Sequence, residues 1–264
     1  VGTSIITNFC KALPKDEEIE KYKVKEWPTL PPSHSLQEVI KEISTKKSHS
    51  VYNHIYKFLK DNPERASAEL NALLSYEKIR GKVPKKIYLL ITDTGTGILC
   101  GTLLQDYLRE NNYEVMPPKV MKGFGIDHTL FDTALASLMH EILSIASVEA
   151  TYKSKIILNA TGGFKPETCF AVIAALLSQK IDVIYYIHES FRTLVFLPTP
   201  PLELPPPLKQ KLLKLDNYPK STINLISISD EEVTRLTEKK LIRDDGKGNI
   251  VMEEWVKPLI QEKS

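Results

Sequence analysis

Two glycine-bearing segments of this sequence combine residue types that bind phosphate groups. In the first, residues 2–8, Gly2 is followed by the hydroxyl residues Thr3 and Ser4 and then by an apolar run. Glycine lets the backbone approach a ligand closely, and hydroxyl groups can donate hydrogen bonds to phosphate oxygens. The same pattern also fits an ordinary helix N-cap, in which a hydroxyl oxygen accepts a hydrogen bond from a free backbone N–H group. The spacing alone leaves both interpretations open.

The second segment, residues 159–167, carries the more informative pattern. A strand-like apolar run is followed by Thr161, Gly162, Gly163, Phe164, Lys165 and Pro166. Proline suits the first position of a helix and disfavours helical geometry at the residue before it, so we expect Lys165 to be held extended outside the helix. A helix N-terminus, glycine backbone and an ammonium group together favour an anion. The alternative is a tight strand–helix turn with a solvated lysine.

A third segment contains Gly95, Gly97 and Gly101 after a strand-like run, and this spacing is similar to a dinucleotide-binding fingerprint. A nicotinamide-dependent enzyme also needs an acidic residue about 20 positions further on, at the end of the next strand. Here Glu114 lies at the wrong end of that strand-like run. The missing ribose contact therefore argues against a dinucleotide cofactor.

Other chemical motifs are weaker. His49 and His54 lie five positions apart without a carboxylate or thiol that completes a metal set, so no metal site is predicted. His188-Glu189-Ser190 follows a strand-like run, but no nucleophile elbow accompanies it. We expect neither a metal nor another cofactor.

The elements that must position these segments alternate along the chain. Strand-like runs at residues 87–92, 113–121, 155–159 and 182–187 alternate with helical patterns at 97–111, 128–147 and 166–179. This order predicts βαβ units and a mostly parallel sheet, although Pro117 and Pro118 interrupt the second run. We therefore predict a doubly wound, Rossmann-like α/β domain over residues 1–200, with a further strand at 194–197. Ligands of such sheets bind beyond the carboxyl ends of the strands, where all three segments begin.

Two parts of the chain depart from this order. Residues 14–80 are polar and lysine-rich, with helical patterns at 36–43, 52–60 and 66–78, and are predicted to form a helical insertion. Prolines crowd residues 198–207, and we place a linker at 201–207. Beyond it, helical patterns at 208–215 and 231–240 precede a strand, a tight turn and a returning strand. This order predicts a small winged-helix-like domain over residues 208–264.

The charge balance limits the partners. The 264 residues carry a formal net charge of +2, so any contact with a polyanion must be local. Residues 208–264 hold 11 Lys/Arg against 10 Asp/Glu, which favours protein contacts or dimerisation and leaves only weak DNA contact open. No apolar run approaches the roughly 18 residues of a membrane span, and no signal peptide is recognisable. We expect a cytoplasmic protein without a membrane partner. Its three cysteines, Cys10, Cys100 and Cys169, lie far apart in the sequence, so we expect buried thiols that a reducing compartment keeps unpaired.

Five segments follow one another in the order found in one known family. They are residues 2–8, 67–73, 93–97, Lys122-Gly-Phe with Phe131, and 161–165. On these motifs, residues 1–200 resemble the CRISPR-associated Rossmann fold (CARF) family and, within it, the archaeal ring nucleases. The Gly-Thr-Ser and Thr-Gly-Gly-Phe-Lys motifs are fairly specific as a pair, whereas either alone is weak.

The resemblance implies a homodimer that binds cyclic oligoadenylate, the second messenger of type III CRISPR defence, in particular cyclic tetra-adenylate. It implies metal-independent cleavage to linear di-adenylate with a 2′,3′-cyclic phosphate, which switches the signal off. The residues that match the family's active residues are Ser4 and Lys165. The expected ligand contacts are Gly2, Thr3, Asn8, Thr94, Thr96, Lys122, Thr161, Gly162, Gly163 and Phe164.

The main alternative is a sensor without catalytic activity. The same pocket would bind the ring, and the winged-helix-like domain would act as a transcriptional regulator or interaction module. An effector ribonuclease of the HEPN type is excluded, because no arginine is followed by a histidine five to seven positions later. A PD-(D/E)xK nuclease is also excluded, since Asp244, Asp245 and Lys247 read as a turn.

Overall fold

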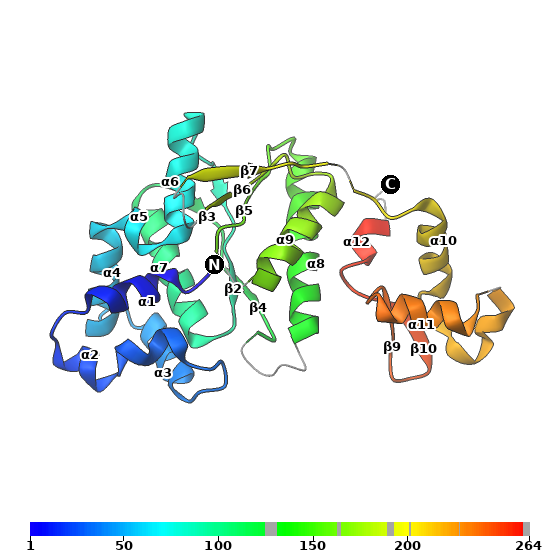
Figure 1. Cartoon of the computed structure of the whole chain (residues 1–264), viewed down its shortest axis with the longest axis horizontal. Helices are drawn as coiled ribbons and strands as arrows, with labels where there is room; N and C mark the ends of the chain where they lie inside the picture. The colour runs from blue at the N-terminus through cyan, green and yellow to red at the C-terminus, as the bar shows by residue number, and fades with distance from the viewer. Residues whose placement is uncertain (125–130, 163–164, 189–192, 201, 227, 261–264) are drawn as a thin grey trace. The chain divides into compact units, whose positions relative to one another are not determined.

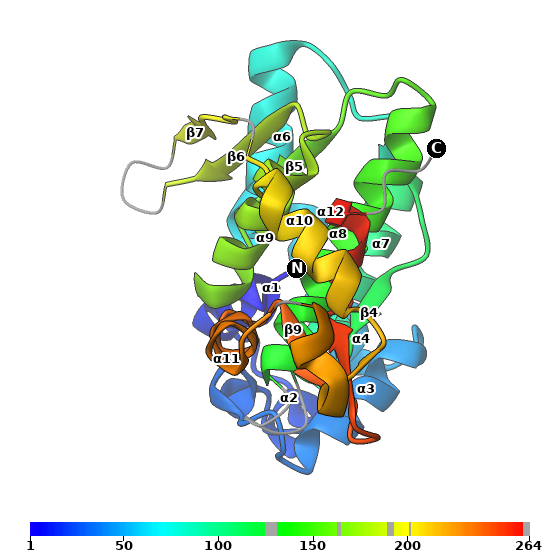
Figure 2. The ribbon, with the colours of Figure 1, turned by 90° about the vertical axis from the view of Figure 1, so that its right-hand side faces the viewer.

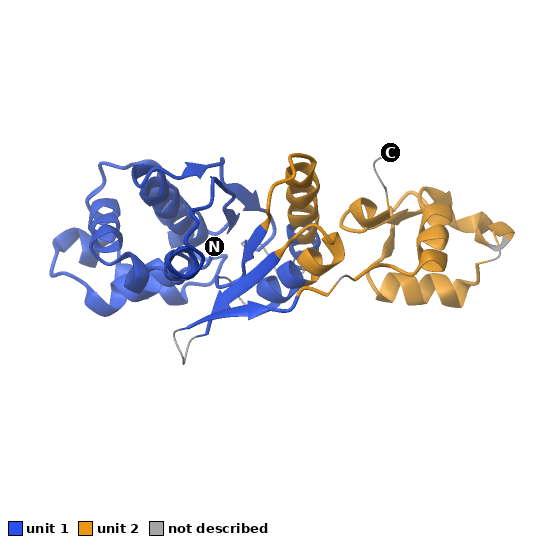
Figure 3. Cartoon of the chain, turned by 90° about the horizontal axis from the view of Figure 1, so that it is seen from above, with its two compact units in different colours: residues 1–138, 157–172, 183–198 blue, residues 139–156, 173–182, 199–264 orange. Residues whose placement is uncertain are grey.

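The computed structural model describes the chain except residues 125–130, 163–164, 189–192, 201, 227 and 261–264 (Figure 1). The side chains of Asp132, Lys165 and Asn224 also lie outside the described part. The chain divides into two compact units (Figure 3). Unit 1 comprises residues 1–138, 157–172 and 183–198, and unit 2 comprises residues 139–156, 173–182 and 199–264.

Unit 1 contains short parallel strand pairs. Strand β1 (Lys86–Ile87) pairs with β3 (Glu114–Val115), and β2 (Leu90–Thr92) pairs with β4 (Lys119–Met121). Backbone bonds from Met116 N to Ile87 O and from Lys119 N to Leu89 O, both 2.9 Å, lie between the two ladders. The predicted break in the strand-like run 113–121 is confirmed, since β3 ends at Val115 and β4 begins at Lys119. Pro117 and Pro118 lie between them and have no N–H group to donate to a ladder.

A second group of strands follows in unit 1. Strand β5 (Ile157–Asn159) is parallel to β6 (Val183–Ile187), and β6 pairs with β7 (Leu194–Leu197) in antiparallel register, as the adjacent arrows of Figure 2 show. The predicted strand at 194–197 is confirmed. The described strands form several small sheets, so the mixed α/β class is confirmed. A single doubly wound sheet is not shown by the described residues.

The three long helices of the predicted βαβ pattern are confirmed. They are α7 (Gly95–Glu110), α8 (Phe131–Thr151) and α9 (Lys165–Ser178). The expectation for Lys165 is wrong, because α9 begins at this residue instead of after it. Pro166 then occupies the second helical position, where its missing N–H still has no intrahelical partner to lose.

The predicted helical insertion consists of short helices. Its predicted helices correspond to α3 (Leu36–Thr45), α4 (Ser50–Asp61) and α6 (Ala68–Arg80). The short helices that were not predicted are α1 (Ser4–Phe9), η1 (Cys10–Ala12), α2 (Glu17–Lys21), η2 (Val24–Thr29) and α5 (Pro63–Ala66). Buried side chains of these helices share one core with α7, including Ile5, Trp27, Ile40, Ile55 and Leu103. The insertion is therefore part of the body of unit 1.

The helix ends follow from local sequence. Ser67 caps α6 by accepting a hydrogen bond from Leu70 N at 3.2 Å, and Thr94 caps α7 by accepting one from Gly97 N at 3.0 Å. Helix α6 ends at Gly81, whose φ of +61° is the left-handed conformation that glycine adopts without strain.

The C-terminal part of unit 2 has its own core. Helix α10 (Pro206–Leu215) is followed by β8 (Tyr218–Pro219) and η4 (Lys220–Ile226). Helix α11 (Asp230–Glu238) then leads into the hairpin of β9 (Ile242–Asp244) and β10 (Asn249–Met252). The last described helix is α12 (Lys257–Ile260). The antiparallel strand order is β8-β10-β9, which confirms the predicted strand, turn and returning strand. The core side chains include Leu212, Leu236, Ile250 and Val256. The winged-helix-like assignment stays a prediction.

The hairpin turn is organised by Asp245. Its carboxylate accepts hydrogen bonds from the side-chain amide of Asn249 at 3.0 Å, from the backbone of Asn249 at 3.0 Å and from Lys247 N at 2.7 Å. These bonds hold the pKa of Asp245 below its usual range. Gly246 and Gly248 supply φ angles of +75° and +89°, which the turn requires.

The three cysteines are free thiols in different environments. Cys100 is buried, as predicted, and burial raises its pKa to about 12, while that of the half-buried Cys10 is raised to about 11. For Cys169 the prediction of burial is wrong, because this residue is exposed on α9. None of the helices in the described part of the chain combines the length and the hydrophobicity that a membrane span requires.

Candidate active site

Glu69, in the first turn of α6, holds the first glycine-bearing segment. Its Oε1 accepts a hydrogen bond from Gly2 N at 2.5 Å, and its Oε2 accepts bonds from Ser4 Oγ at 3.0 Å and Ser67 Oγ at 2.9 Å. All three donors therefore point at one half-buried carboxylate. Glu69 lies in the segment 67–73 of the family resemblance, but no role was predicted for it.

The hydroxyl group of Ser4 is engaged in two hydrogen bonds. It donates to Glu69 and accepts a bond of 3.1 Å from Ala68 N. Thr3 is the N-cap of α1 by position, but within the described residues its side chain makes no capping hydrogen bond. Thr3 therefore does not cap α1, whereas Ser4 does accept a free helix N–H group, that of Ala68 at the start of α6, as the structural interpretation of this segment predicts. Since a hydroxyl has one proton and two lone pairs, Ser4 keeps one lone pair with which to accept a further bond.

The second segment meets the first at the same glutamate. A Cβ atom on Gly162 would overlap Oε1 of Glu69, so only glycine fits beside the carboxylate as it stands. The side chain of Asn159, at the end of β5, donates to Glu69 O at 3.1 Å and accepts from Thr161 N at 3.1 Å. Residues 2–4 and 159–162 therefore both contact Glu69, in the first turn of α6.

The second segment is also tied to its neighbours in unit 1. Thr161 Oγ1 accepts a hydrogen bond of 3.1 Å from Ile187 N, and Thr168 Oγ1 donates to Gly162 O at 3.3 Å. The remaining predicted residues of this segment, Gly163 and Phe164, lie outside the described residues. For Lys165 the structure gives the backbone as the start of α9.

The third segment is held inside the protein. Thr94 caps α7 and pairs with Thr92 Oγ1 at 3.0 Å. Thr96 is buried, and its N–H donates to Oε1 of Gln37, on α3, at 3.0 Å. Both predicted contacts are thus already bonded within the protein.

The glycines of the third segment have a packing role. A Cβ on Gly95 would overlap the backbone of Gln37, and one on Gly97 would overlap Thr92 Oγ1. One on Gly101 would lie 2.6 Å from Ile91 Cγ2. The spacing that is similar to a dinucleotide fingerprint therefore serves the close packing of α7 on α3 and β2.

Two further predicted contacts lie at the margins of this region. Asn8 joins α1 to the residues before α6, because its side chain donates to Ala66 O at 3.2 Å and accepts from Lys11 Nζ at 3.1 Å. Lys122 is exposed after β4. The next residue, Gly123, donates its N–H to Asp93 Oδ2 at 2.8 Å, which links the ends of β2 and β4.

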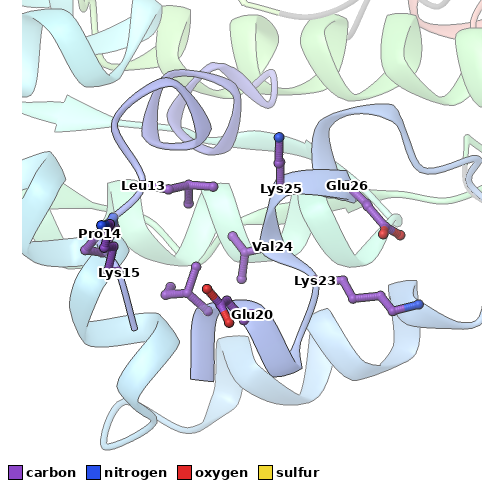
Figure 4. A pocket seen from close by; sticks show the side chains of 9 residues that line it. Leu13, Pro14, Lys15, Glu20, Lys23, Val24, Lys25 and Glu26 are labelled. Atoms are coloured by element: carbon purple, nitrogen blue, oxygen red, sulfur yellow. The ribbon is translucent and has the colours of Figure 1, made fainter. Parts of the chain in front are cut away.

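The pocket in Figure 4 lies elsewhere, in the helical insertion of unit 1. It has a volume of about 420 Å³, and its charged lining residues are Lys15, Glu20, Lys23, Lys25 and Glu26. Three lysines and two glutamates line it, so its charged lining is of mixed sign. The pocket includes none of the predicted site residues. Among the described residues, no group of three His, Cys, Asp or Glu side chains could hold a metal ion.

Unit 1 is thus an α/β protein unit in which the first glycine-bearing segment donates a backbone N–H group and a hydroxyl group to the Glu69 carboxylate, and the second segment lies beside it at Gly162. The chain belongs to the CRISPR-associated protein family Cas_APE2256, whose model matches residues 64–200, more than half of the chain. The matched span includes Glu69, Thr161 and Gly162, whereas Gly2 and Ser4 precede it.

Proposed function

We propose that this protein is a ring nuclease of the CARF type, which binds cyclic tetra-adenylate and cleaves it to linear di-adenylate. The observation that carries the proposal is the meeting of residues 2–4 and 159–162 at Glu69. Membership of a CRISPR-associated family supports it. In this function the protein removes the second messenger of type III CRISPR defence from the cytoplasm and ends the signal.

The fold proposed with this function is a Rossmann-like CARF domain over residues 1–200, followed by a linker and a winged-helix-like domain. The parallel pairs β1–β3, β2–β4 and β5–β6 support a sheet whose carboxyl ends carry the ligand. A ring of four nucleotides has two-fold symmetry, so an isologous homodimer supplies a cradle of matching symmetry.

The proposed reaction requires little chemistry from the protein. A ribose 2′-hydroxyl of the ring attacks its neighbouring phosphorus, and the bond from phosphorus to the 5′-oxygen breaks, leaving a 2′,3′-cyclic phosphate. The nucleophile is part of the ligand, so orientation and stabilisation of phosphate charge suffice without a metal. Lys165 stabilises that charge, and Ser4 orients the attacking hydroxyl.

The remaining predicted residues serve binding in this proposal. Gly2, Thr3, Thr161 and Gly162 line the ring beside Ser4, with Gly163, Phe164 and Lys122 completing the contact surface. Thr94, Thr96 and Asn8 hold their loops in place through the hydrogen bonds they already make inside the protein.

Incubation of the full chain with cyclic tetra-adenylate in EDTA tests the proposal, with the products separated by chromatography. Linear di-adenylate is the expected product. Lys165→Ala should slow cleavage by about 10²–10³, the usual effect of removing one electrostatic donor. Lys155→Ala is the matched control, since it removes an exposed lysine before β5 and should leave the rate unchanged. Equal rates for both variants would remove Lys165 from the mechanism.

The sensor function remains the second candidate, and the separate core of the C-terminal part favours it. A sensor would bind the ring and leave it intact during long incubation. Its C-terminal part would then transmit the signal to DNA or to a protein. Salt-dependent binding of duplex DNA by the full chain, altered by addition of the ring, would support this function over the ring nuclease.

A further inference from the structure

The hydrogen bonds of Ser4 determine which role its hydroxyl can take. Its proton already points at Glu69 Oε2, at 3.0 Å, and one lone pair is occupied by Ala68 N–H. A hydroxyl in this state offers a lone pair, and no proton, to a bound ligand. Ser4 is thus suited to accept a hydrogen bond from the 2′-hydroxyl of a ribose, and unsuited to donate one to a phosphate oxygen.

The surroundings of Glu69 fix the carboxylate in the position that this role needs. Gly2 N–H is bonded to Oε1, while Ser67 Oγ joins Ser4 Oγ on Oε2. Glycine at position 162 leaves room for the carboxylate, which any side chain there would displace. The distance of 3.0 Å between Ser4 Oγ and Glu69 Oε2 lies within the range for direct proton transfer to a general base.

We propose that Glu69 acts through Ser4 as the final proton acceptor of the ring-opening step, an inference that rests on the proposed ring nuclease function. As the 2′-oxygen forms its bond to phosphorus, its proton passes to Ser4 Oγ, and the proton of Ser4 passes to Glu69 Oε2. The bond from phosphorus to the 5′-oxygen breaks with its electron pair, and the 5′-oxygen takes a proton from water. Glu69 returns its proton to solvent after product release.

A purely structural role for Glu69 makes a different prediction. In that case the carboxylate only fastens residues 2–4 to α6, and its replacement would lower stability and ligand affinity together. In the relay, Glu69→Gln retains an oxygen that accepts from Gly2 N–H but presents an amide to Ser4, which can no longer pass on its proton. The loss then falls on the cleavage rate.

The test measures single-turnover cleavage of cyclic tetra-adenylate by the full chain and by three variants: Glu69→Gln, Ser4→Ala and the double variant. Each single variant should slow cleavage by about 10²–10⁴, the usual contribution of general base catalysis. The double variant should be no slower than the slower single variant, because both act in one relay. Affinity for the ring and the unfolding midpoint should change much less than the cleavage rate. Glu64→Gln, in the exposed ion pair with Lys78, is the matched control and should cleave like wild type.

A second measurement needs no variant. Two protons move together in the relay, so the wild-type rate should depend quadratically on the deuterium fraction of the solvent. A linear dependence, or additive losses in the double variant, would overturn the relay while leaving ring cleavage intact. Cleavage by Glu69→Gln at the wild-type rate would do the same. A wild-type chain that leaves the ring uncut would overturn the proposed function itself, and the relay with it.

Discussion

The start of α7 depends on a side chain from α3, and this dependence can be tested. Gln37 and Thr96 are each 6% exposed, and Gln37 Oε1 accepts the N–H of Thr96 at 3.0 Å. The first N–H groups of a helix have no partner inside the helix. Thr94 accepts the N–H of Gly97, whereas that of Thr96 relies on Gln37. Replacement of Gln37 by methionine keeps a similar length and volume but removes this acceptor.

The expected loss follows from that one bond. A buried donor left without a partner costs about 1–3 kcal/mol. The second polar contact of Gln37, from Nε2 to Pro31 O, is 3.4 Å long and adds little. Gln37→Met should therefore lower the free energy of unfolding by about 1–3 kcal/mol. Urea unfolding measures this change, and hydrogen exchange should show faster exchange of the Thr96 amide.

A matched control lies one residue further along α3. The side chain of Glu38 is 79% exposed, so Glu38→Gln should stay within about 0.5 kcal/mol of wild type. If Gln37→Met is as stable as this control, and the Thr96 amide exchanges as in wild type, the reasoning about the start of α7 is refuted.

Three further predictions concern titratable groups. Burial raises the pKa of Glu77, and the Tyr113 hydroxyl, 2.9 Å from Glu77 Oε1, opposes that shift, so Tyr113→Phe should raise the pKa further. An unchanged carbon-13 carboxyl titration would contradict this. The pKa of Asp245 is lowered in the fold, so its stabilisation is present above the unfolded pKa of about 3.9 and is lost as the pH falls through the folded value. The stability advantage of wild type over Asp245→Asn should therefore shrink as the pH falls below about 4, and a constant difference would refute the assignment. Maleimide should label the exposed Cys169 in the folded chain but reach the buried Cys100 only after unfolding, and labelling of Cys100 without unfolding would show that its burial is wrongly described.

Local sequence patterns predicted most long elements. The spacing of apolar residues indicated α3, α4, α6 and α7, and the apolar run at Leu194–Leu197 predicted β7 with the bounds that the structure shows. Proline predicted the break between β3 and β4, since it lacks the ladder donor. Short helices such as α1 and α5 were missed, because four to six residues carry too little periodicity to identify.

The candidate site was predicted only in part. Residue types marked both glycine-bearing segments. Residues 67–73 contributed to the family resemblance, but Glu69 by itself has the pattern of an ordinary acidic residue in the first turn of a helix, where it interacts favourably with the helix dipole. Its functional signal is long-range, because its bonds to Gly2 and Ser4 span 67 and 65 residues. Conversely, the glycines of the third segment looked like a nucleotide motif, and only the packing of α7 shows that they make room for neighbouring atoms.

The sequence by itself determined the α/β class, the long elements and the residue types that favour an anion, because these depend on neighbours along the chain. The tertiary structure decided which of those residues share a site and which way each hydrogen bond runs. In the proposed function, Ser4 can accept a hydrogen bond from the ligand only because α6 brings a carboxylate to its proton. That assignment depends on distance in space, which no spacing along the chain specifies.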